Sequence, residues 1–121
     1  MTNDEARQQP IPTAWRQAFQ DVVKAFVAGD YRLDRGIPAV EPIDSDTATR
    51  ISRYIQDYGA TLTALPEDTW ASSVCIWTGN HWDALVDLWT KEEGRSDLVL
   101  HAKVFDEKPG FLVRIHLVHV P

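Results

Sequence analysis

The chain has 121 residues, 44% of them hydrophobic and 25% charged, which is typical of one soluble globular domain. Its formal net charge of −6 argues against nucleic-acid binding, which depends on clustered lysine and arginine side chains. The only cysteine, Cys75, cannot form an internal disulfide, and no apolar run approaches the ~20 residues that span a bilayer, so we expect a cytoplasmic protein without a membrane partner.

Two amphipathic helices are predicted in the N-terminal half. Residues 1–12 are mostly polar, and we expect them to form a flexible leader. Apolar residues recur at helical spacing over residues 14–28, and Gly29 is a natural helix end. A second helix is expected from residue 44 or 45, where an aspartate or a serine can cap it, to about residue 58. The intervening residues 30–44 contain two prolines and one glycine and should form a loop.

From residue 72 onward the hydrophobic period changes to that of strands. Four alternating runs predict four strands, namely SSVCIWT (72–78), HWDALVDLW (81–89), DLVLHAKVF (97–105) and FLVRIHLVHV (111–120). The links are short, including Gly79-Asn80, which suits a type II′ turn, so the strands should form an antiparallel meander. Residues 60–65 are a candidate fifth strand at one edge. We therefore predict an α+β fold for residues 13–121, with both helices on one face of this sheet.

The alternation also predicts which residues lie opposite one another. Across the first turn, Trp77 should lie beside Trp82 and Cys75 beside Ala84. The pairing that begins at Asp106 and Phe111 should continue along both strands to six further pairs, which include Ala102 with Ile115, Leu100 with Leu117, and His101 with His116.

Two registers stay open for the second and third predicted strands. One places Asp83 beside Lys103 and Leu85 beside His101. The other, shifted by two residues, brings Asp87 beside His101. In both, acidic residues of one strand meet basic residues of its neighbour, which stabilises a sheet by about 0.2–1 kcal/mol per pair.

Eight candidate binding residues share the face of the sheet that points away from the helices, which we call the outer face. They are His81, Asp83, Asp87, Trp89, His101, Lys103, Arg114 and His116. One interpretation is a solvated face held by cross-strand charge pairs. The other is an interaction surface, because apolar residues such as Leu85 and Val99 lie among the charges. A homodimer through this face, or docking of the 30–44 loop over it, would explain the mixture.

No residue pattern on this face predicts a catalytic centre. The sequence lacks a nucleophile elbow, a P-loop, a glycine-rich dinucleotide motif and a His-Glu-x-x-His motif, and we expect no cofactor. His116 and His119 should point to opposite faces of a strand, which argues against a metal pair. Lys103 opposite Arg114 is unfavourable by itself and predicts an anion or an acidic neighbour there.

The C-terminal half, from Trp70 to Pro121, resembles a family of small uncharacterised bacterial proteins. The segments that carry this resemblance are SVCIWTGNHWDALVDLW, EEGRSDLVL and the closing FLVRIHLVHVP. The resemblance implies a stand-alone bacterial cytosolic domain and supplies no catalytic residues. Some small acidic α+β proteins of this kind are immunity or antitoxin-like partners, which is an analogy of size and charge.

These observations favour a non-enzymatic interaction domain that binds a protein partner, either a second copy of itself or an immunity-type partner. The alternative is a small ligand-binding or hydrolytic domain that uses Asp83, Asp87, His101 and His116. This alternative predicts a concave pocket on the outer face and an effect of a metal or ligand on thermal stability.

Overall fold

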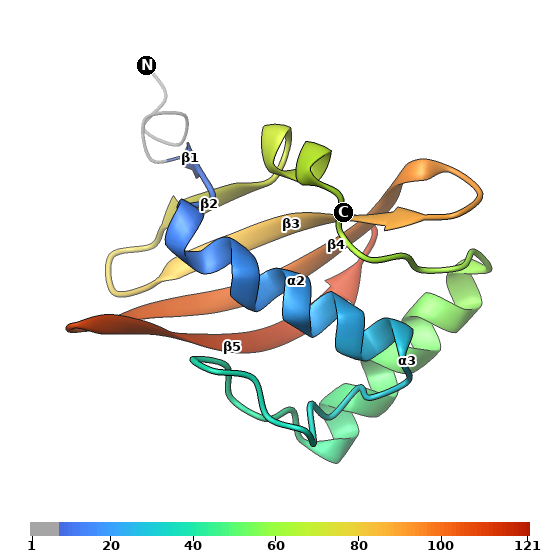
Figure 1. The fold of residues 1–121 in the computed structure, drawn as a ribbon, viewed down its shortest axis with the longest axis horizontal. Coiled ribbons are helices and arrows are strands. Elements are labelled where there is room, and N and C mark those ends of the chain that lie inside the picture. Colours follow the sequence, from blue (N-terminus) through green and yellow to red (C-terminus); the bar gives the residue numbers. More distant parts are fainter. Residues whose placement is uncertain (1–7) are drawn as a thin grey trace.

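The computed structural model describes residues 8–121, which form two helices and one antiparallel sheet (Figure 1). The five strands are neighbours in chain order: β1 (Gln8–Pro10), β2 (Val74–Trp77), β3 (Trp82–Thr90), β4 (Gly94–Glu107) and β5 (Gly110–His119). The helices are α2 (Thr13–Val27) and α3 (Ser45–Tyr58), and a short 3-10 helix, η1, covers Glu67–Ala71. The predicted α+β fold is confirmed. None of the helices in residues 8–121 has the length and apolarity needed to cross a membrane.

Helix α2 lies across one face of the sheet and forms the centre of the core (Figure 1). Its buried side chains recur at helical spacing and are Trp15, Ala18, Phe19, Val22, Val23 and Phe26. They belong to the same core as fully buried residues of the sheet, such as Val86, Leu100 and Val104. Burying one such large side chain contributes roughly 1.5–3 kcal/mol, so this contact dominates the stability of the domain.

Helix α3 lies alongside β5, and the buried residues Ala48, Ile51 and Ile55 join the same core. The side chain of Asp44 accepts a hydrogen bond of 2.7 Å from the backbone N–H of Thr47, which makes it the expected N-cap. Gly59 ends the helix with φ of 86°, a left-handed conformation that favours glycine. These two residues set the start and the end of the helix.

The fifth strand lies outside the segment that was predicted to supply it. β1 pairs with β2, whereas residues 60–65 form only a single bridge, between Leu62 and Thr90. The predicted flexible leader is therefore wrong for residues 8–12, where β1 is followed by the fully buried Ile11. Proline is tolerated here because β1 is an edge strand. Residues 1–7 of that leader lie outside the described residues.

Most of the predicted cross-strand register is confirmed. The confirmed pairs are Trp77 with Trp82, Cys75 with Ala84, Asp83 with Lys103, Leu85 with His101, Asp106 with Phe111 and Ala102 with Ile115. The alternative register of β3 and β4 is wrong, because Asp87 lies opposite Val99 rather than His101. Gly79 has φ of 111°, in the positive range that the predicted turn requires of its first central residue.

The last hairpin departs from the predicted register at a β-bulge. His101 pairs with Leu117 and Leu100 pairs with Val118, so His116 is an extra residue in β5. The predicted pairs of Leu100 with Leu117 and of His101 with His116 are therefore wrong by one residue. As a consequence Val118 faces the core with 3% exposure, and Leu117 is half-buried.

The 30–44 loop does not cover the outer face. Leu33, Val40 and Ile43 are buried in the helical core, and Val40 forms a bridge to Val113 at the edge of β5. The loop therefore pairs with the sheet edge beside α3. This excludes loop docking as the explanation for the mixed character of the outer face.

Candidate functional site

The outer face is the side of the sheet opposite α2. Of the eight predicted residues, six are half-buried, and Arg114 and His116 are exposed. The confirmed register of β3 and β4 brings His81, Asp83, His101 and Lys103 together on adjacent strands. Trp89 lies apart from them, near the end of β3, where it pairs with Arg95 of β4.

Asp83 lies at the centre of the polar part of this face. Its Oδ1 atom is 3.2 Å from Nε2 of His81 and 3.4 Å from Nε2 of His101, although only the first of these contacts is a hydrogen bond. The ring of His101 also lies edge-on to that of His116, with centroids 5.2 Å apart, and 6.4 Å from that of His119. The four histidines of the chain and Asp83 therefore form one cluster across β3, β4 and β5.

The local environment lowers the pKa of His116 from its ordinary value of 6.5. Partial burial is the largest cause, and the neighbouring His101 and Lys103 act in the same direction. His116 is therefore neutral at pH 7. A neutral imidazole can accept or donate a hydrogen bond without adding charge to the surface.

Asp87 does not belong to this cluster. Its carboxylate accepts a hydrogen bond from the hydroxyl of Ser72, and its backbone groups bond to Ser73 and Thr69. Asp83, Asp87, His101 and His116 are thus not brought to one point, as a hydrolytic site built on these four residues would require. Within residues 8–121, no group of three or more histidine, cysteine, aspartate or glutamate side chains could hold a metal ion.

Arg114 has the acidic neighbour that its position opposite Lys103 predicts. Its guanidinium donates to both carboxylate oxygens of Glu41, at 2.8 and 3.2 Å, and lies 5.0 Å from the centre of the Phe105 ring. The Glu41 carboxylate comes from the loop that pairs with β5. The paired guanidinium in turn holds the pKa of Glu41 below its ordinary value.

Apolar side chains make up the rest of the outer face. Half-buried members from four strands are Val74, Ile76, Leu85, Phe105 and Leu117, and Val99 is 8% exposed. Cys75 points to the other face, where burial raises the pKa of its thiol to about 11, so it is not a nucleophile at neutral pH. The outer face therefore combines an apolar surface with a polar cluster and has no activated nucleophile among these residues.

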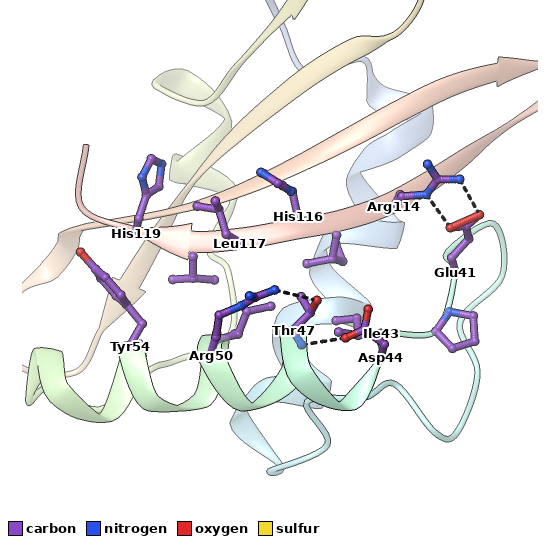
Figure 2. Close-up of a pocket in the computed structure, with 14 residues that line it drawn as sticks. Glu41, Ile43, Asp44, Thr47, Arg50, Tyr54, Arg114, His116, Leu117 and His119 are labelled. Atoms are coloured by element: carbon purple, nitrogen blue, oxygen red, sulfur yellow. Dashed lines mark hydrogen bonds and ion pairs between the residues drawn. The ribbon is translucent and has the colours of Figure 1, made fainter.

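A second feature, which the sequence did not predict, is a groove of about 760 Å³ between α3 and β5 (Figure 2). Thr47, Arg50 and Tyr54 line it from the helix, and residues 114–119 line it from the strand. Those three helical residues follow at intervals of three and four, so the sequence does show a polar stripe on one face of the helix. The stripe lines a groove because α3 lies alongside β5.

A family model described as a domain of unknown function (DUF7668) matches residues 23–121, a longer stretch than the segment from Trp70 that carries the sequence resemblance. No curated protein and no solved structure matches the chain.

Proposed function

We propose, from the premise that the chain belongs to this family of domains of unknown function (DUF7668), that it is a non-enzymatic interaction domain whose outer face binds a second copy of the same chain. The observation that carries the proposal is the composition of a face that neither α2 nor α3 covers. Half-buried apolar residues such as Leu85 and Phe105 lie beside charged and polar ones. Apolar surface surrounded by polar groups is typical of an interface.

Charge supports a second copy as the occupant. The chain carries a net charge of −6, yet on the outer face Lys103 on β4 offsets part of the charge of Asp83 and Asp87 on β3, and Arg114 on β5 is paired with Glu41. Two copies can therefore approach through this face with less repulsion than through the rest of their acidic surface.

The arrangement of these charges is also self-complementary. A two-fold axis that runs along the strands, between β3 and β4, lays β3 of each copy over β4 of the other. Asp83 of one copy then lies over Lys103 of the other, because these residues are opposite one another in the sheet. In the same way, Leu85 of one copy lies over His101 of the other copy and over the apolar residues around that histidine. Packed sheets lie about 10 Å apart, which lets such side chains interdigitate.

The size of the face indicates a moderate affinity. Five strands spaced about 4.8 Å apart, with about eight residues each, give a face of roughly 600 Å² per copy. A total of roughly 1,200 Å² is at the lower end of specific interfaces. We therefore expect a dimer with a dissociation constant in the micromolar range. We also propose a cytoplasmic location, which the free and buried Cys75 supports because disulfides are rare in that compartment.

Sedimentation equilibrium on the wild type and two matched variants tests this function. Leu85→Glu places a charge at the centre of the face and should yield a monomer. Val27→Glu makes the same kind of change at a 50% exposed residue of α2 and should leave the dimer intact. A wild type that stays monomeric at several hundred micromolar, or a Leu85→Glu variant that still dimerises, would refute the proposal.

A further inference from the structure

The α3–β5 groove, lined by Thr47, Arg50 and Tyr54 on one side and residues 114–119 on the other, has the shape of a strand-binding site. β5 is the last strand in the sheet, so within residues 8–121 one of its edges has no neighbouring strand. Figure 2 shows Arg50 and Tyr54 rising from α3 toward this edge. A helix beside a free strand edge leaves room for one more extended chain, which such edges bind through backbone hydrogen bonds.

The backbone of β5 offers unpaired groups inside the groove. The N–H and C=O of Val113 point to the free edge, where they bond to the backbone of Ala39 and Glu41. Ile115 is two residues further along, so its N–H and C=O face the same edge. Within residues 8–121, no loop, turn or side chain forms a hydrogen bond with the N–H or C=O of Ile115 at this edge. They are the first free positions on this edge.

The far end of the groove is closed by the hydroxyl of Tyr54, which accepts a hydrogen bond of 3.1 Å from the N–H of Val120. Val118 is two residues before Val120, so its N–H and C=O also face the edge. The open edge thus runs between Val113 and Val120. It spans roughly 20 Å, the length of an extended segment of about six residues.

The chain already shows what this edge accepts. Residues 39–41 add to β5 as a one-residue parallel bridge, and the Glu41 carboxylate at the end of this segment pairs with Arg114. Arg50, the next guanidinium along the groove, bonds only to the hydroxyl of Thr47 and has no carboxylate partner within residues 8–121. A second acidic segment would find both a free backbone edge and an unpaired cation.

We propose that the α3–β5 groove binds an extended acidic segment of a partner protein, which adds to β5 as a sixth strand and places a glutamate or aspartate side chain on Arg50. The edge groups of Ile115 and Val118 lie in the plane of the sheet, whereas the proposed dimer uses side chains of the outer face, of which Arg114, His116 and Leu117 also line the groove.

Titration with the blocked peptide acetyl-Val-Glu-Val-Glu-Val-Glu-amide tests the groove. We expect saturable binding at ~10–100 μM, with amide shifts in NMR spectra confined to residues 114–119 and the facing turns of α3. Arg50→Ala should weaken binding about tenfold, because it removes a charge-assisted hydrogen bond. Arg53→Ala, an exposed arginine of the same helix that does not line the groove, should leave binding unchanged.

Two peptide variants separate the backbone contribution from the charge contribution. Two peptides can be N-methylated at alternate residues, one at the odd and one at the even positions, and only the peptide whose methylated nitrogens would bond to β5 should fail to bind. Glutamine in place of glutamate should weaken binding about tenfold. Three results would each overturn the proposal. The first is no saturation up to about 1 mM, and the second is equal affinity of both methylated peptides and the parent peptide. The third is equal affinity of the Arg50→Ala and Arg53→Ala variants for the peptide. The Leu85→Glu variant should bind the peptide normally, so a failed dimer and a failed groove give different results.

Discussion

Asp83 is the residue that links the polar side chains of the outer face. Its carboxylate lies within 3.4 Å of two imidazoles, and the second of these, His101, contacts the ring of His116. Alternation along β3 predicted that Asp83 faces outward, because every second residue of a half-buried strand does so. It did not predict which histidines meet Asp83, since this depends on the register of β4 and on the bulge in β5.

The wild-type domain should lose folding stability as the pH falls from about 7.5 to about 5, and replacing His116 with glutamine should make this loss smaller. Burial, then His101 and Lys103, lower the pKa of His116 in the folded protein below 6.5. The unfolded chain therefore binds a proton here at higher pH than the folded chain, and stability is lost as pH falls through 6.5. Thermal unfolding at both pH values measures the effect. An equal fall of Tm in the wild type and the variant would contradict it.

The element that decides both candidate surfaces is β5. Its outward side chains complete the outer face, and its free edge forms one wall of the α3–β5 groove. The bulge at His116 changes which side chains point outward: it moves Val118 into the core and leaves Leu117 at the groove. A single extra residue therefore sets the surface that a partner meets.

The bulge can be tested by substituting two adjacent residues of β5. Val118→Ser should destabilise the domain by roughly 2–4 kcal/mol, because it removes buried apolar groups and buries a hydroxyl. Leu117→Ser should cost about 1 kcal/mol or less, since Leu117 is only half-buried. Urea unfolding followed by tryptophan fluorescence measures both. If Leu117→Ser were the more destabilising of the two variants, Leu117 would face the core, as the register without a bulge predicts.

The sequence predicts an element well where its apolar and polar residues follow a regular period, and poorly where they do not. The helices and four strands follow from clear periods, and alternation narrows the register of β3 and β4 to two alternatives, of which the structure has the one that pairs Asp83 with Lys103. The bulge was not predictable, because Leu117 and Val118 are both apolar and either could face the core. β1 was missed because its three residues, QQP, are polar and end in proline, and an edge strand requires neither alternation nor a donor at that proline.

At the scale of the whole molecule, the domain has one side closed by α2 and one side open. α2 covers the inner face of the sheet and α3 lies along β5, so neither helix covers the opposite face (Figure 1). The α3–β5 groove could not be predicted from the sequence, since Arg50 and residues 114–119 are far apart in the chain. Only the contact of α3 with β5 brings them together.

If two copies of the chain meet through their outer faces, isotope-filtered NMR on a mixture of ¹³C-labelled and unlabelled protein will detect the contact. We expect intermolecular NOEs from the methyl groups of Leu85 to the side chains of Val99 and His101. These signals should vanish in Leu85→Glu. Intermolecular NOEs from Val27 or Tyr54 instead, or none at a concentration of several hundred micromolar, would contradict the outer-face contact.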